Sequence, residues 1–481
     1  MDEGKYIMQI NRNMSAVVAN NQLLGIEERL SASIERLSSG LKINRASDNP
    51  AGMAISNKMK AQIDALDQAE ANAADGISVV QIADGALNEV SSILQRIREL
   101  SVQAANGINS FNDRQSMQDE VNELIKEVDR ISSDTEYNTK KLLDGSSNVR
   151  VYGDNGSRYQ VSDSVDAKVY SLNVEAVATQ ATVALDYEVP QVDGMISING
   201  VGANITTGMS QEAYLQAVRN AAAEAGCSVE ISEDGSQMLI LSDYYGYDEA
   251  IEVSVTEELA VAAGVTGHED CEYDPEKKVY NVNTTGVDAV VTIPTNLEES
   301  GFTTTTTVEC HGNRVVVTDN DGFSIDFLLD EEYEPVADAA NGNFEIDVTD
   351  IGSLTIQVGA NEYQTMDVRI EEVSAYTLYL DTVDVAIENG ADRAMGTLDD
   401  AIAKVSATRS RIGAFQNRLE YAEKSLSSSV ENITAAYSGL LDTDMAEEMT
   451  EYTQQNILNQ AAISVLSQAN ELPQQILSML Q

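Results

Sequence analysis

Hydrophobic residues recur every seven positions through a long stretch near the start of the chain. Two such rows lie three residues apart: Met59, Leu66, Ala73, Val80, Leu87 and Leu94, and Ala69, Ala83, Val90, Ile97 and Ala104. This is the period of a coiled-coil seam. Asp48 or Asn49 can cap the helix, Pro50 suits its first turn, and Asn106 and Gly107 suit its end. The pattern predicts one helix of about 57 residues, roughly 85 Å long, which needs partner helices alongside it.

A second seam of the same period lies near the other end of the chain. It consists of Leu398, Val405, Ile412, Leu419, Leu426, Ile433 and Leu440, with Phe415, Ala422 and Ala436 on the adjoining row. Two seams of this length can bury each other. We therefore expect the two ends of the chain to pack together and the residues between them to form an insertion.

Shorter helices are predicted on either side of these seams. One begins at about Ser15, and another runs from about Arg114 to Ser132 and packs antiparallel on the long helix. The pattern also returns to helix from Ala375, with a break at Gly390. A last helix follows a cap or joint at 442–444. Its apolar positions are Ile457, Ala461, Val465, Ala469 and Leu472, and Pro473 is expected to interrupt it near its end.

Between about Asn138 and Arg369 the hydrophobic period changes to two, which predicts strands and turns. Hairpins are expected at 228–241, 314–328 and 354–370 because strand-like runs there flank short polar turns. One helix, capped by Ser210, is expected over 211–225. The run Thr303 to Thr307 could accept sugars, but the pattern favours a plain edge strand.

Composition narrows the classes of partner. The formal charge is −50, and residues 151–352 alone hold 38 acidic and 6 basic residues. This disfavours nucleic acid and a basic membrane-binding face. No run of 18 apolar residues exists, and the N-terminus lacks the pattern of a cleaved signal peptide. Cys227, Cys271 and Cys310 are an odd number, which favours free thiols, although one pair could bridge.

Catalytic chemistry has few candidates. The two histidines, His268 and His311, are not in a His-Glu-x-x-His motif. Each lies near a cysteine, Cys271 or Cys310, but exposed loop residues are a better reading than metal ligands. The acidic run 330–332 could hold a weak cation, but it reads better as a solvated charge run. We therefore predict no enzyme activity, no catalytic residues, no cofactor and no metal.

Several stretches resemble bacterial flagellins. They are residues 34–44 (IERLSSGLKIN), 46–52 (ASDNPAG), 75–78, 89–103, 135–143, 411–419 (RIGAFQNRL) and 469–477 (ANELPQQIL). The resemblance covers about 150 residues at the start of the chain and about 130 at the end. It departs from the family before Met8, where an upstream start or a tag could account for the extra residues.

The resemblance implies an α+β fold: a long α-helical coiled-coil rod formed by the two chain ends, with a mostly β central insertion. Residues 1–7 would be a tail. Residues 8–50 with 442–481 would form a terminal helical filament-core domain, and 51–150 with 353–441 the helical rod with its β-hairpins. Residues 151–352 would be the variable acidic outer region.

The resemblance also implies a function, namely self-assembly into the flagellar filament for motility. Partners would be other copies of the chain, an export chaperone, and cap and junction proteins, and export would occur without a cleaved signal peptide. The expected assembly core is Leu23, Leu30, Ile34, Leu37, Ile457, Val465 and Leu472. Alternatives are a hook–filament junction protein, or an adhesin or enzyme displayed on a filament through residues 151–352.

Flagellins also resemble one another at the surface bound by Toll-like receptor 5. This chain matches that surface at Gln95, Arg96, Glu99 and Leu100, with Glu120 on the third helix. Positions three and four apart share a helical face. The resemblance therefore implies a receptor site with a cation, an anion and an apolar knob. A solvated charged face that contacts neighbouring subunits is the plainer reading of the same residues, and the two readings are compatible.

Overall fold

A computed structural model describes residues 13–162, 164–232, 234–247, 250–267, 270–294, 300–320, 322–335 and 342–479. The predicted tail 1–7 and His268 lie outside the described residues. The chain divides into two compact units. One comprises Met1–Ala74, Gln357–Thr365 and Glu420–Gln481, and the other Asp75–Ile356 and Met366–Leu419. We call them the terminal unit and the large unit.

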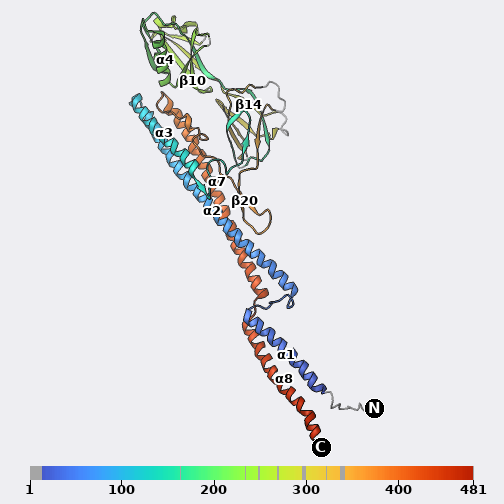
Figure 1. Ribbon diagram of the computed structural model, residues 1–481. Helices are drawn as coiled ribbons and strands as arrows, with labels where there is room; N and C mark the ends of the chain where they lie inside the picture. The colour runs from blue at the N-terminus through green and yellow to red at the C-terminus, as the bar shows by residue number, and fades with distance from the viewer. Residues whose placement is uncertain are drawn as a thin grey trace. The chain divides into compact units, whose positions relative to one another are not determined.

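Two helices, α1 (Met14–Ser39) and α8 (Met445–Met479), pack along each other in the terminal unit (Figure 1). The side chain of Asn13 caps α1 by accepting a hydrogen bond from the Ala16 N–H, and Asp444 caps α8 in the predicted joint. The expected interruption at Pro473 is wrong, because α8 continues beyond it to Met479.

The chain segments that lead into this helix pair meet in a short antiparallel bridge. Leu41 pairs with Asp442, and the Lys42 N–H donates to the Leu441 carbonyl at 2.6 Å. Gly40 ends α1 with φ 73°, a left-handed conformation that glycine adopts without steric cost. The bridge thus joins the start and the end of the chain at one point of the terminal unit.

The long helix is α2 (Pro50–Ala104), and its predicted start at Pro50 is confirmed. Asn49 caps it by accepting from the Gly52 N–H at 2.9 Å. The partner seam lies on α7 (Gly390–Leu441). Buried seam positions are Leu66, Ala69, Ala73, Val80, Ala83, Leu87, Val90, Leu94, Ile97 and Ala104 on α2, and Leu398, Val405, Ile412, Phe415, Leu419 and Leu426 on α7.

Ion pairs fix α2 against α7 in the large unit. Arg98 contacts Asp399 at 2.6 Å, and Arg409 contacts Asp84 at 2.9 Å. The third predicted helix is α3 (Phe111–Asp134), which lies beside α2 (Figure 1). A capping box formed by Ser110 begins it. The prediction of long helices from both chain ends that pack together is therefore confirmed.

The predicted helix from Ala375 is wrong. Residues 371–389 form turns around a single 3-10 turn, η2 (Leu380–Thr382), and Gly390 begins α7 instead of breaking a helix. Side chains of α3 hold this segment: Asp129 accepts from the Ala375 N–H at 2.7 Å, and Gln118 bonds the backbone of Val383 and Val385. Its apolar residues are buried in an irregular conformation that a local pattern cannot reveal.

Small hairpins complete the helical part of the chain. They are β1 (Glu136–Tyr137) with β2 (Lys140–Lys141), and β19 (Leu354–Gln357) with β20 (Thr365–Val368). The second was predicted from its alternating pattern and is confirmed.

Two four-stranded sheets pack together and form the first β core of the large unit. One has the order β14-β5-β18-β3 and the other β15-β16-β17-β4. Their bounds are β3 (Val151–Tyr152), β4 (Gly156–Val161), β5 (Val169–Ala176), β14 (Val290–Thr292), β15 (Thr307–His311), β16 (Arg314–Thr318), β17 (Ser324–Leu329) and β18 (Phe344–Val348). The sheets share one core, in which the rings of Phe327 and Phe344 stack at 5.1 Å. The hairpin predicted at 314–328 is β16–β17.

A second β core is built from residues inserted between β5 and β14. Its sheets have the orders β6-β10-β9 and β12-β13-β11-β7-β8. Their bounds are β6 (Gln180–Asp186), β7 (Gly194–Ile198), β8 (Val201–Ile205), β9 (Cys227–Ile231), β10 (Gln237–Tyr245), β11 (Ala250–Thr256), β12 (Cys271–Asp274) and β13 (Val279–Thr285). The helices α4 (Gln211–Glu224) and α5 (Glu257–Ala260) and the 3-10 turn η1 (Val265–Gly267) accompany them. The predicted Ser210 cap and the hairpin β9–β10 are confirmed.

The expected edge strand at 303–307 is wrong for most of its length, because β15 begins only at Thr307. The hydroxyls of Thr303, Thr305 and Thr306 converge on the carboxylate of Asp319, with Thr305 at 2.6 Å. These bonds lower the pKa of Asp319 to about 2. Threonine hydroxyls bonded to one carboxylate favour a turn here over the extended ladder that β-branched residues usually form.

Candidate functional site

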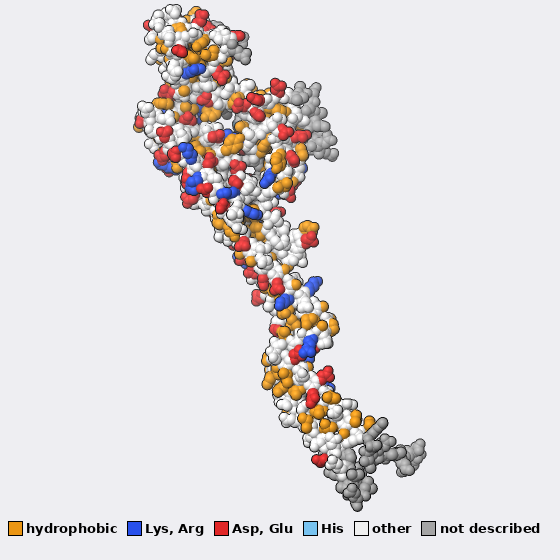
Figure 2. Space-filling view, in the orientation of Figure 1, with side chains coloured by type: hydrophobic (Ala, Val, Ile, Leu, Met, Phe, Trp, Pro, Cys, Tyr) orange, Lys and Arg blue, Asp and Glu red, His pale blue; other side chains and the backbone are white. Residues whose placement is uncertain are grey.

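The terminal unit exposes many apolar side chains. Twelve residues of α1 and α8 are 40 to 64% exposed: Met14, Val17, Val18, Leu24, Ile34, Met445, Met449, Ile457, Leu458, Ile463, Val465 and Leu472. Figure 2 shows hydrophobic side chains gathered on these helices. We call these twelve residues the terminal apolar surface. Contiguous apolar surface on a soluble chain typically marks an interaction site.

Polar groups occupy the interior of the same helix pair. Ser33, Glu448 and Gln455 are only 2%, 7% and 6% exposed. Each has a side-chain oxygen without a hydrogen-bond partner among the described residues, although Glu448 also contacts Arg36 at 3.6 Å. Buried polar atoms without partners cost free energy. The pair therefore buries these polar side chains and exposes many apolar ones, which is the opposite of the arrangement in the core of a globular domain.

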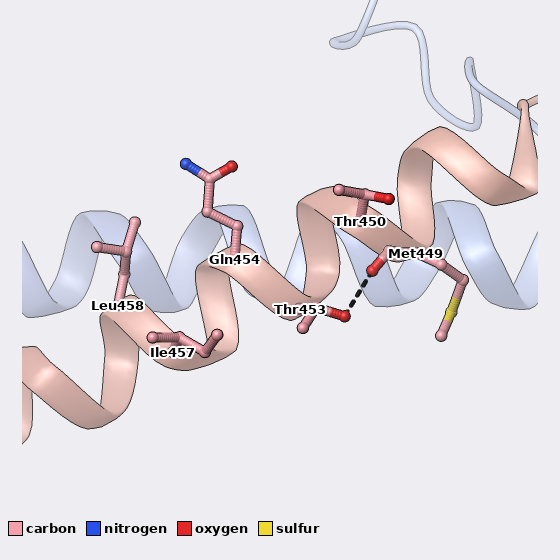
Figure 3. A pocket seen from close by; sticks show the side chains of 6 residues that line it. All are labelled: Met449, Thr450, Thr453, Gln454, Ile457 and Leu458. Carbon is pink, nitrogen blue, oxygen red and sulfur yellow. Dashed lines mark hydrogen bonds between the residues drawn. The ribbon is translucent and has the colours of Figure 1, made fainter.

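Grooves run over this surface. One of about 520 Å³ follows α8 alone and is lined by Met449, Thr450, Thr453, Gln454, Ile457 and Leu458 (Figure 3). The Thr453 hydroxyl donates to the Met449 carbonyl at 2.8 Å, so that it bonds within its own helix. A second groove, of about 630 Å³, lies between the helices, with Met14, Val18 and Val465 among its walls. Such grooves can receive apolar side chains from another helix.

The expected assembly residues fall into two groups. Leu23, Leu30 and Leu37 are half-buried on α1. The other four, Ile34, Ile457, Val465 and Leu472, are 49 to 62% exposed and belong to the terminal apolar surface. Sequence reasoning did not identify the buried polar residues Ser33, Glu448 and Gln455. Their positions between apolar rows of the two helices were the available signal.

Comparison with known proteins decides the family. The family model described as the bacterial flagellin N-terminal helical region matches residues 10–148, and that of the C-terminal helical region matches residues 395–480. A flagellin of Clostridium tyrobutyricum is 32% identical over 97% of this chain and 100% of its own length. The chain belongs to the bacterial flagellin family. It is therefore a structural subunit of the flagellar filament.

Other flagellins are similar to a comparable degree. A flagellin of Salmonella typhimurium is 30% identical over 98% of this chain and 99% of its own length. A solved structure of FliC from Burkholderia pseudomallei covers 71% of this chain and 99% of its own, with 19% identity and a TM-score of 0.23. That TM-score is too low for the structural match to bear on the argument.

The residues implied as a receptor site in flagellins lie on α2 and α3 of the large unit. Arg96 contacts Glu120 at 2.8 Å and Glu99 at 3.3 Å, and the hydrogen bonds that its guanidinium donates to these carboxylates raise the pKa of Arg96. Gln95 is exposed beside them. Leu100 is only 2% exposed, so the expectation of an exposed apolar knob is wrong. The exposed patch is polar and consists of Gln95, Arg96, Glu99 and Glu120.

The candidates for catalysis and metal binding stay apart. No three His, Cys, Asp or Glu residues among those described could hold a metal ion together. None of Cys227, Cys271 and Cys310 forms a disulfide, and burial raises the pKa of Cys271 and of Cys310. No described helix has the length and apolarity needed to cross a bilayer.

Proposed function

We propose that this filament subunit joins copies of itself through the terminal apolar surface. The proposal rests on the arrangement of side chains in the α1–α8 pair. Ser33, Glu448 and Gln455 are buried in it. Ile34, Ile457 and Val465 are exposed on it. Burial of apolar area gives about 25 cal/mol per Å². Neighbouring copies that cover the exposed side chains would gain this free energy, which the isolated helix pair does not gain.

Substitution of the central apolar residues of α8 tests this proposal. Ile457→Gln and Val465→Gln keep a helix-compatible side chain but remove apolar surface. We expect each variant to raise the concentration needed for polymerisation, measured by sedimentation of filaments grown from purified subunits. Glu451→Gln on the same helix is the matched control, because Glu451 is exposed and lines neither groove. Normal assembly of both apolar variants would contradict the proposal.

We further propose that the chain is exported to the cell exterior without a cleaved signal peptide. The membership of the chain in the flagellin family supports this proposal. An export chaperone would cover the terminal apolar surface before assembly, and cap and junction proteins would contact the growing filament. Co-purification of the chain with its chaperone, lost on removal of α8, would test the first of these partners.

Receptor recognition is a second proposed function. The polar patch of Gln95, Arg96, Glu99 and Glu120 would bind Toll-like receptor 5 in the monomer, as the family resemblance implies. Support comes from the side-chain exposure of Arg96, Glu99 and Glu120, which is 49%, 70% and 47%. The same patch would contact neighbouring subunits in the filament, so that the filament would not bind the receptor.

A further inference from the structure

A cleft of about 420 Å³ lies in the large unit and shares no residue with the terminal apolar surface or with the polar patch on α2 and α3. It is formed by the turn between β15 and β16, the ends of β10 and β17, residues 377–382, and α7. Tyrosine rings, those of Tyr244, Tyr245 and Tyr379, form part of its walls. Small-molecule sites typically measure about 300 to 1,000 Å³ and combine aromatic walls with a few polar groups. The cleft therefore has the size and lining of a ligand site.

Each arginine and lysine of the cleft lies within 3.5 Å of a carboxylate. Arg314 contacts Asp326 at 2.9 Å, and Lys404 lies 3.5 Å from the same carboxylate. Arg158 is held by Asp381 at 2.5 Å. An anionic ligand would have to compete with these internal carboxylates, so the cleft does not favour a phosphate or an organic acid.

Hydrogen-bonding capacity remains at other positions of the cleft. Asn313 is only 6% exposed, and its Oδ1 accepts from the Ala178 N–H at 3.2 Å. Its amide nitrogen has no acceptor among the described residues, so this donor remains available in the cleft that Asn313 lines. The carboxylate of Asp400 is 72% exposed and, among the described residues, contacts Arg314 at 3.4 Å. Glu331 is exposed and accepts from the Tyr245 hydroxyl at 2.7 Å. Donors and acceptors with spare capacity thus face one small space.

We propose that this cleft binds a neutral sugar of one or two rings. Each sugar hydroxyl is both a donor and an acceptor, which suits the Asn313 amide together with the carboxylates of Asp400 and Glu331. The apolar face of a sugar ring can pack on the ring of Tyr245. A phosphate would meet the rim carboxylates of Asp400 and Glu331, which disfavours it. A protonated polyamine offers donors but no acceptor for the Asn313 amide, which disfavours it as well. Such binding would be an activity separate from filament assembly.

Binding to the full-length monomer tests the proposal directly. Glucose, galactose, mannose and N-acetylglucosamine are each added at millimolar concentration, and saturation-transfer NMR detects contact. Inorganic phosphate and spermidine serve as anionic and cationic probes. We expect at least one sugar to bind and neither charged probe to compete with it. Binding of phosphate or spermidine in place of every sugar, or of no probe, would overturn the proposal.

Two variants test whether the sugar binds in the cleft. Asn313→Asp keeps the oxygen that accepts from Ala178 but removes the free donor, and Asp400→Asn removes an exposed acceptor charge. We expect each to weaken sugar binding at least tenfold, with circular dichroism unchanged. Asp399→Asn is the matched control, because Asp399 neighbours Asp400 on α7 but pairs with Arg98 and does not line the cleft. Equal weakening by Asp399→Asn, or unchanged binding in both cleft variants, would refute the assignment.

Discussion

The side-chain amide of Asn13 donates a hydrogen bond to the backbone carbonyl of Ala469 at 2.8 Å. The same side chain caps α1, so one residue fixes both the start of α1 and its alignment with α8. The contact lies within the α1–α8 pair, whose interior contains polar oxygens that have no hydrogen-bond partner among the described residues. Burial within such a pair contributes little to its stability. The stability therefore depends on the surfaces that pack against the pair from outside.

Helix α1 should therefore be weakly protected in the monomer. Isolated helices of this size are marginal in water, and the α1–α8 interior adds little apolar burial. We expect amides between Leu23 and Leu37 to exchange rapidly in the monomer and slowly in the filament, as measured by hydrogen exchange with mass spectrometry. The stretch Leu87 to Leu94 is the internal reference, because its seam residues are fully buried and should protect it in both states. Equal protection of α1 in both states would refute this expectation.

The second β core should be dispensable for assembly. The Thr179 N–H donates to the Val287 carbonyl at 2.9 Å, so the chain enters and leaves this core at adjacent positions. Deletion of residues 180–286 with direct joining of Thr179 to Val287 would remove α4 and α5 together with this core, but would leave the first β core and the helices α1, α2, α3, α7 and α8 in place. We expect electron microscopy to show filaments of the shortened protein. A soluble monomer with normal helical content would show instead that the deleted core makes essential contacts.

The helical seams could be predicted because a seven-residue period identifies a buried row whatever lies opposite it. Leu100 shows the limit of this reasoning. It lies outside the two seam rows but is only 2% exposed, so the buried stripe of α2 is wider than the two rows predict. The apolar stripe of α3 was visible in the sequence, but which residues of α2 it would cover was not.

Other parts of the fold depend on contacts between distant residues. The conformation of 371–389 is set by Gln118 and Asp129, more than 240 positions away in the sequence. The cleft brings Asn313 near α7 only because the first β core packs on that helix. Neither relationship produces a recognisable pattern in the local sequence. The exposed apolar residues of the terminal unit were predicted as apolar, but their exposure was not, because no local pattern shows which surfaces pack against α1 and α8.

The threonine cluster should make stability depend on acid pH. Hydrogen bonds hold the pKa of Asp319 at about 2 in the folded protein, below its ordinary value of about 3.9. A lowered folded-state pKa adds stability above the ordinary value, and this contribution is lost as the pH falls through the folded value. Asp319→Ala should therefore lower the Tm at pH 7, and the difference from wild type should shrink between about pH 4 and pH 2. Calorimetry across this range measures it, with Glu334→Ala as the control. A difference that is the same at pH 7 and pH 2 would exclude this origin.

The exposed patch on α2 and α3 should bind the receptor through Arg96. Its guanidinium is half-exposed and is oriented by Glu99 and Glu120. Loss of a central anchor typically costs about 2 kcal/mol or more, so Arg96→Ala should weaken binding of the monomer to the ectodomain of Toll-like receptor 5 roughly thirtyfold. Since the ion pairs of Arg96 are exposed, the same change should leave the Tm nearly unchanged. Surface plasmon resonance and calorimetry on one preparation would measure both.

The Leu100→Ala variant distinguishes a direct contact between Leu100 and the receptor from an effect of lower protein stability. Since Leu100 is buried, its truncation should lower stability by about 2 to 5 kcal/mol. Receptor affinity should stay close to wild type wherever the variant is folded, because the side chain does not reach the surface. Lys126→Ala, which removes an exposed cation of α3 paired only with Glu123, is the control for a general loss of positive charge. If Lys126→Ala weakens binding as much as Arg96→Ala does, the patch is not the anchor. If Leu100→Ala abolishes binding while the Tm is unchanged, Leu100 contacts the receptor after all.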